Sequence, residues 1–102
     1  MIRHIVMWKL KDEALGLQKP ALAVELKKRL EALPSRVPGI LALEVGLNVV
    51  EGETSRDVVL VSTFDSLATL KAYNEHPAHQ EVVAFVKQVV EERRAVDFQA
   101  AL

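Results

Sequence analysis

Side chains suited to acid–base chemistry are concentrated in one segment, Tyr73-Asn74-Glu75-His76-Pro77-Ala78-His79, and a further histidine, His4, lies near the N-terminus. If Pro77 is the first residue of a helix, His79 lies in its first turn, where the positive end of the helix dipole lowers the pKa of an imidazole. A neutral imidazole takes a proton from a substrate near pH 7. We therefore expect His79 to be a general base, Tyr73 to place its phenol on a carbonyl oxygen, and His4 to be a third, positioning group.

These residues also have structural interpretations. His76 can cap the helix that Pro77 begins, His79 can bond a backbone carbonyl, and Tyr73 can simply pack. A metal site is a further alternative, because His76 and His79 are three residues apart and His4 would complete a set of three. No carboxylate is placed to assist, and Pro77 interrupts the pair, so we expect neither a metal nor a cofactor. Cysteine nucleophiles, glycine-rich phosphate loops, GxSxG and HExxH are all absent from the sequence.

The elements that position these side chains follow from hydrophobic periodicity. Alternation of apolar and polar residues predicts strands, and apolar residues with a period near 3.6, such as Leu22, Leu26 and Leu30, predict a helix against a sheet. In chain order, the predicted elements are a strand over 2–10, a helix from about Pro20 to Leu33, strands over 40–50 and 57–64, a helix over about 67–73 capped by Asp65 or Ser66, a helix from Pro77 to about Val90, and a strand over 94–99.

The order βαββαβ predicts an α+β fold: a ferredoxin-like, four-stranded antiparallel sheet with the helices on one face, in a single domain over 1–102. Strands 40–50 and 57–64 carry apolar residues on both sides, so the uncovered face would be a large exposed apolar patch in a monomer. Pairing that face with a copy of itself buries it. We expect a homodimer through the sheet face, which closes a dimeric α/β barrel.

Composition excludes several partners. Thirteen basic against fourteen acidic residues give a net charge of −1, without a basic run, so we expect no nucleic acid. An RNA-recognition domain shares the element order but needs aromatic and basic residues on its central strands, and strand 57–64 offers only a terminal Phe64. The longest apolar run, 82–86, is far too short to span a bilayer, and no signal peptide is recognisable. We expect no membrane and a cytoplasmic protein.

The segment Arg3-His4-Ile5-Val6-Met7-Trp8-Lys9-Leu10-Lys11, together with the Tyr-x-x-His-Pro-x-His segment that ends at His79, resembles the stress-responsive A/B barrel domain family. The resemblance covers nearly the whole chain and implies a dimeric ferredoxin-like fold. A plant member of that family is a cofactor-free polyketide cyclase, whose catalytic tyrosine and histidine match Tyr73 and His79 and whose first-strand histidine matches His4. A further pocket tyrosine of that enzyme falls on Leu26, which departs from the pattern.

The leading functional hypothesis is a homodimer that binds a small apolar or aromatic molecule between helices and sheet, as a cofactor-independent lyase or cyclase. Small residues such as Ala42 and Gly46 leave room for a ligand. The alternatives are a non-enzymatic, stress-related structural dimer and a cofactor-free monooxygenase.

Overall fold

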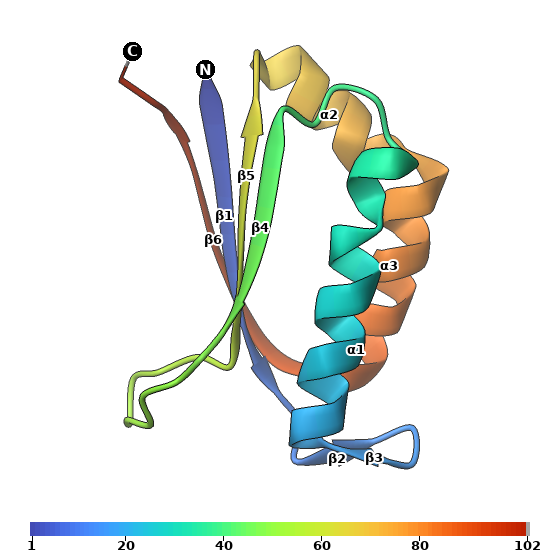
Figure 1. Cartoon of the computed structure of the whole chain (residues 1–102), viewed down its shortest axis with the longest axis vertical. Coiled ribbons are helices and arrows are strands. Elements are labelled where there is room, and N and C mark those ends of the chain that lie inside the picture. The colour runs from blue at the N-terminus through green and yellow to red at the C-terminus, as the bar shows by residue number, and fades with distance from the viewer. Residues whose placement is uncertain (102) are drawn as a thin grey trace.

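The computed structural model describes residues 1–101, and over these residues a four-stranded antiparallel sheet carries three α-helices on one face (Figure 1). The predicted α+β, ferredoxin-like arrangement is confirmed. The elements are β1 (Ile2–Leu10), β2 (Glu13–Ala14), β3 (Leu17–Gln18), α1 (Lys19–Glu31), a short 3-10 helix (Leu33–Ser35), β4 (Ala42–Leu47), β5 (Val58–Phe64), α2 (Leu67–Glu75), α3 (Pro77–Val89) and β6 (Val90–Gln99).

The first strand lies at the centre of the sheet, whose order is β4-β5-β1-β6. Because β1 pairs antiparallel with both β5 and β6, the last strand runs beside the first. His4 lies opposite Ser62 on β5 and opposite Asp97 on β6. This register places side chains more than ninety residues apart in sequence on one small area of the sheet.

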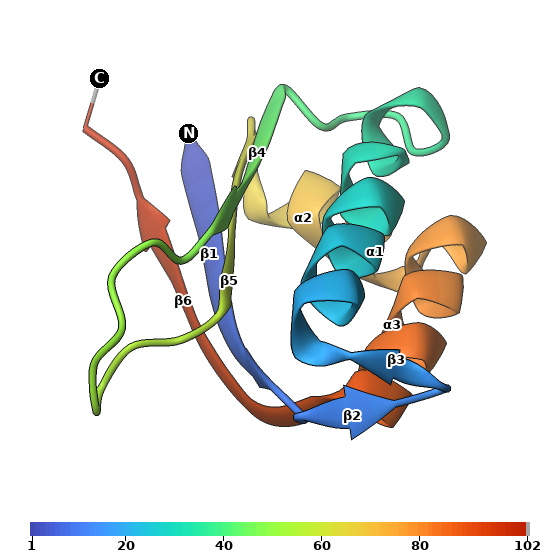
Figure 2. The ribbon, with the colours of Figure 1, turned by 60° about the horizontal axis from the view of Figure 1, so that its bottom comes forward.

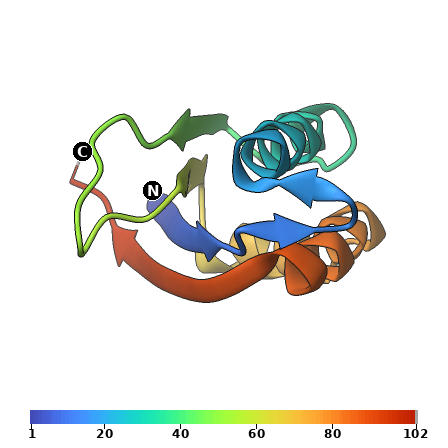
Figure 3. The ribbon, with the colours of Figure 1, turned by 90° about the horizontal axis from the view of Figure 1, so that it is seen from below.

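The two faces of the sheet have different surroundings. On β1, His4, Val6 and Trp8 are buried beneath the helices, whereas Arg3 and Met7 on the alternate face are exposed, as the period of two requires. Figures 2 and 3 show the helices and the small β2–β3 hairpin on one side, and the long β4–β5 loop reaching past the other side. The side with the helices therefore encloses the core, and nothing among residues 1–101 covers the other face.

Helix ends follow local chemistry. The Ser66 hydroxyl accepts a hydrogen bond from the Thr69 N–H (3.2 Å) and caps α2. The chain then breaks at His76, whose Nδ1 accepts a bond from the Ala78 N–H (3.0 Å), and Pro77 is the first residue of α3. The predicted helix break and the capping role of His76 are confirmed, and of the two predicted caps Ser66 is the one used.

Several strand boundaries differ from the sequence-based expectation, and one hairpin was not expected. Strand β4 covers 42–47 rather than 40–50, since the Asn48 side chain binds the Val50 carbonyl (2.8 Å) and turns the chain away. Strand β6 starts at Val90 rather than 94, directly after α3. The β2–β3 hairpin was not predicted, because its strands have two residues each; its turn places Leu15 and Gly16 at positive φ (53° and 77°).

Substituting Gly39 by alanine is expected to destabilise the chain more than the same change at Gly16. Both glycines have positive φ (92° and 77°), so alanine costs roughly 1–2 kcal/mol at either position. At Gly39 the new Cβ would lie 2.5 Å from Thr69 Cγ2, whereas Gly16 has nothing within 4 Å. Overpacking should add roughly 1–3 kcal/mol at Gly39 alone. Urea unfolding of both variants measures the difference, and equal losses would contradict the clash.

Candidate active site

A cavity of about 170 Å³ lies between α3 and the covered face of the sheet. Half of the residues in its walls are aliphatic, and the other half are aromatic or polar residues contributed by β1, α2, α3 and β6. The lining residues are His4, Val6, Trp8, Leu30, Leu60, Tyr73, His79, Val82, Val83, Val86, Lys87 and Arg93. An apolar cavity with a few convergent polar groups is the usual form of a small-molecule site.

The three site residues predicted from sequence meet in this cavity. Tyr73 is a buried residue of α2, and His79 lies in the first turn of α3. Because the chain breaks at His76 between the two helices, the ring centroids of Tyr73 and His79 are 4.4 Å apart. The centroid of His4, on β1, lies 6.1 Å from that of Tyr73. Phe64 packs against the opposite side of Tyr73 at 5.0 Å and holds its ring in place.

His79 is oriented by a backbone carbonyl. Its Nδ1 lies 3.1 Å from the Asn74 oxygen, and because a carbonyl only accepts, Nδ1 carries the proton. Nε2 of the neutral ring is then a proton acceptor. Burial lowers the pKa of His79, the Asn74 hydrogen bond opposes this, and electrostatic effects of the nearby His4 and Arg93 lower the pKa further. The direction agrees with the expectation, but burial rather than the helix dipole is its main cause.

Tyr73 and Trp8 each bury a donor without an acceptor. Among residues 1–101, neither the Tyr73 hydroxyl nor Trp8 Nε1 has a hydrogen-bond partner, although the two side chains are only 1% and 4% exposed. Burial raises the pKa of Tyr73 to about 12, against a lowering by the Arg93 charge, so the phenol stays protonated at neutral pH. Buried donors are nearly always satisfied, so an acceptor that enters the cavity could bond to them.

His4 is held by a partner that the sequence did not reveal. Its Nδ1 contacts Oδ1 of Asp97, which faces it across the β1–β6 ladder. A carboxylate on Nδ1 fixes the orientation of the imidazole ring. Asp97, Trp8, Lys87 and Arg93 were all missed as site residues. The alternation of 93, 95 and 97 on one strand face was available as a signal, but the register that aims this face at His4 was not.

The structure also shows where His76 lies and whether residues that could bind a metal are grouped together. His76 caps α3 and does not line the cavity. Within the part of the chain that the structure describes, no three histidine, aspartate or glutamate side chains are grouped so that they could hold a metal ion. In the same residues, no helix is long and apolar enough to cross a membrane.

The sequence of this chain matches a known protein family and a known protein. Residues 2–100 match the model of the stress responsive A/B barrel domain. An uncharacterized protein of Streptomyces coelicolor is 32% identical over 88 residues, which cover 86% of this chain and 89% of that protein.

Solved structures with the same architecture include one close in sequence and one distant. A dimeric protein of unknown function with a ferredoxin-like fold, from Bacteroides fragilis, aligns with a TM-score of 0.86 and 34% identity over 97% of this chain and 95% of its own. A hydroxynitrile lyase from Passiflora edulis aligns with a TM-score of 0.81 over 95% and 90% of the two chains, but with 16% identity. At that identity the likeness concerns the fold alone.

Proposed function

Because the chain belongs to the stress responsive A/B barrel domain family, we propose that it binds a small, mostly apolar carbonyl compound in the cavity beneath α3 and acts on it as a cofactor-independent lyase or cyclase. The observation that carries the proposal is the combination of two unpartnered buried donors, Tyr73 and Trp8, with a histidine whose free nitrogen is a base. A carbonyl oxygen supplies the missing acceptor, and the neighbouring C–H supplies the proton.

The proposed step is deprotonation beside the carbonyl. Nε2 of His79 takes a proton from the carbon next to the carbonyl, and the electron pair of that bond moves onto the oxygen. The Tyr73 hydroxyl donates to this oxygen and stabilises the enolate as charge develops on it. The enolate then either attacks a second carbonyl of the same molecule, which closes a ring, or expels a leaving group. His79, now protonated on Nε2, gives this proton to the new hydroxyl oxygen or to the leaving group, and His4, held by Asp97, positions the substrate.

The similar proteins do not indicate whether the reaction is a ring closure or the loss of a leaving group. The Bacteroides fragilis protein has no known function, and the hydroxynitrile lyase from Passiflora edulis is too distant in sequence for its reaction to be assigned to this chain. The choice of proton abstraction therefore comes from the residues of this chain. Leu26, where the plant cyclase has a tyrosine, is fully buried in the core and lies outside the cavity lining, so substrate contacts in this chain come from other positions.

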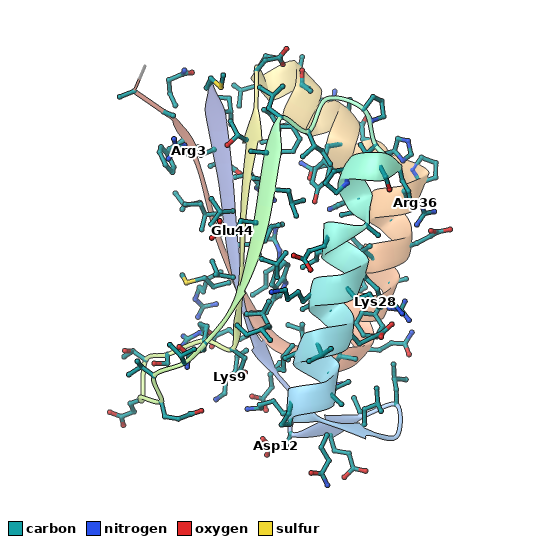
Figure 4. The ribbon with its side chains drawn as sticks, viewed as in Figure 1. Arg3, Lys9, Asp12, Lys28, Arg36 and Glu44 are labelled. Carbon is teal, nitrogen blue, oxygen red and sulfur yellow. The ribbon has the colours of Figure 1, made fainter. Side chains whose placement is uncertain are left out.

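The proposal includes dimerisation through the uncovered face of the sheet. Its centre is apolar, and three of its larger side chains are 41–53% exposed in the single chain: Met7, Val96 and Phe98. Charged residues such as Arg3, Lys9 and Glu44 lie along this sheet, whereas Lys28 and Arg36 lie on the helix layer (Figure 4). An apolar centre with a polar rim is typical of a homodimer interface, and similar structures are described as dimeric.

Filling the cavity tests whether the ligand binds there. Trp8 is the only tryptophan in the chain and lines the cavity, so its indole N–H signal in a nitrogen–proton correlation spectrum reports on the site. Acetophenone, a one-ring ketone, is expected to shift this signal in a saturable way. Val82→Phe, at a buried wall position, should abolish the shift. Val24→Phe, at a 60% exposed position on α1, should leave it unchanged.

Two results would contradict the proposed site. If acetophenone and related small ketones do not shift the Trp8 signal of the wild-type protein, the protein has no such ligand site. A Val82→Phe variant that is folded, as judged by its thermal unfolding, and still binds like the wild type places the ligand elsewhere.

A further inference from the structure

Two cationic side chains, Lys87 near the end of α3 and Arg93 on β6, form the exposed part of the cavity lining. Among residues 1–101, no carboxylate forms an ion pair with either of them. Every acidic side chain of α3 and β6 is already paired with another residue: Glu81 with Arg36, Glu91 with Lys9, Glu92 with Arg56, and Asp97 with His4. The opening of the cavity therefore carries two positive charges that the protein itself does not neutralise.

Arg93 belongs to the site by register as well as by position. It lies opposite Trp8 in the β1–β6 ladder, so its side chain shares the covered face with Trp8 and His4. Its neighbour Arg94 lies on the alternate face and pairs with Glu92 (3.6 Å). Burial is the main cause of both pKa shifts in the site, and the positive charge of Arg93 acts on both groups as well: it opposes the raised pKa of Tyr73 and adds to the lowered pKa of His79.

The interior of the cavity limits the size and polarity of what these cations meet. Its aliphatic walls include Val6, Leu30, Leu60, Val82 and Val86. A cavity of about 150 Å³ holds one benzene ring, so the observed 170 Å³ fits a single ring with small substituents. The buried Tyr73 hydroxyl, which has no hydrogen-bond partner among residues 1–101, also lines the cavity and requires an acceptor.

From these three features we propose that the ligand is a monocyclic organic acid: its carboxylate binds Lys87 and Arg93 at the opening, its ring contacts the aliphatic walls, and an oxygen substituent accepts from the Tyr73 hydroxyl. This inference rests on the proposed function and names its substrate class. A carboxylic acid is ionised at neutral pH. The guanidinium of Arg93 binds a carboxylate through two parallel hydrogen bonds, and Lys87 adds a point charge.

A matched pair of probes tests the inference directly. Meta-hydroxybenzoate and meta-hydroxybenzamide share size, ring and hydroxyl but differ in charge. The wild type is expected to bind the acid roughly tenfold more tightly than the amide, measured at the Trp8 indole signal. Because both cations are exposed, each of Lys87→Gln and Arg93→Gln should reduce this preference only about threefold. The double variant should lose it, and Arg93→Lys, which keeps the charge, should retain most of it.

Controls separate this effect from net charge. Lys28→Gln removes one positive charge from the exposed side of α1, outside the cavity lining (Figure 4), and should keep the full preference for the acid. Raising the salt concentration should weaken acid binding and leave amide binding unchanged.

Each outcome decides a separate point. Equal binding of acid and amide by the wild type overturns the acid inference but leaves the proposed small-molecule site. A double variant that keeps the preference shows that other groups recognise the carboxylate and overturns the assignment to Lys87 and Arg93. Failure of acid, amide and acetophenone alike to shift the Trp8 signal overturns the inference together with the proposed function.

Discussion

Replacing His79 by glutamine or Tyr73 by phenylalanine is expected to lower the rate of proton removal from a bound ketone roughly 10²–10⁴-fold, the usual contribution of a positioned acid or base. Glutamine keeps a polar group beside the Asn74 carbonyl but cannot accept the proton. Phenylalanine keeps the packing of Tyr73 against Phe64 but cannot donate to the carbonyl oxygen. Exchange of the ketone's α-hydrogens for deuterium, followed by proton NMR, measures this step even before a natural substrate is known.

The stability of the Tyr73→Phe variant separates a functional role from a structural one. The hydroxyl is buried without a partner, so removing it should leave the free energy of unfolding unchanged or raise it by about 1 kcal/mol. A loss of activity together with unchanged or increased stability is expected only if the hydroxyl serves a ligand. If exchange and binding survive both substitutions while the protein remains dimeric, the catalytic assignment fails and a non-enzymatic dimer is the better interpretation.

The pH dependence of the same reaction follows from the two pKa shifts. His79 acts as a base only when neutral, so kcat/KM rises with pH through its pKa. Because burial lowers that pKa below the ordinary value of 6.5, activity should persist at pH values where an exposed histidine is already protonated. At the alkaline end, Tyr73 keeps its proton up to a pKa of about 12. A half-maximal rate above pH 7 on the acid limb would contradict the role of His79.

Val61→Asp is expected to convert the proposed dimer to a folded monomer. Val61 lies on the uncovered face of the sheet, with Ile5 opposite it on β1 and Glu44 opposite it on β4. Two-fold pairing places the substitution on both sides of the interface, so two carboxylates lose water at once. Each buried, unpaired charge costs several kcal/mol, and Glu44 adds like-charge repulsion. The dissociation constant should rise at least about a thousandfold, which corresponds to roughly 4 kcal/mol.

A matched substitution on the opposite side of the molecule is the control for the interface. Val24 is 60% exposed on α1, and Val24→Asp should leave the dimer intact. Sedimentation equilibrium of the wild type and both variants measures the association, and circular dichroism confirms that the monomer is folded. A wild type that sediments as a monomer, or a Val61→Asp variant that remains dimeric, would contradict pairing through this face.

Local patterns in the sequence determined most of the architecture. Alternation over residues 2–10 predicted β1 and its buried side, because a strand repeats every two residues whatever it pairs with. Ser66 and Pro77 marked the starts of α2 and α3, since capping and the missing proline N–H act over a few residues. The Tyr73–His79 segment also indicated where the polar groups of a site would be. The β2–β3 hairpin escaped prediction because two-residue strands leave no period to detect.

Only the tertiary structure decided which groups surround those side chains. Asp97 reaches His4, and Arg93 faces the cavity rather than the uncovered face, because of the register between the first and last strands. A shift of one residue in that register would turn both side chains to the other side of the sheet. The cavity that Tyr73 and Trp8 line is likewise formed by six separate elements, so the surroundings of their buried donors depend on the packing of all six. Residue types and local spacing therefore determined the candidate acid and base, whereas long-range pairing determined the charged residues around them, their hydrogen-bond partners and the cavity.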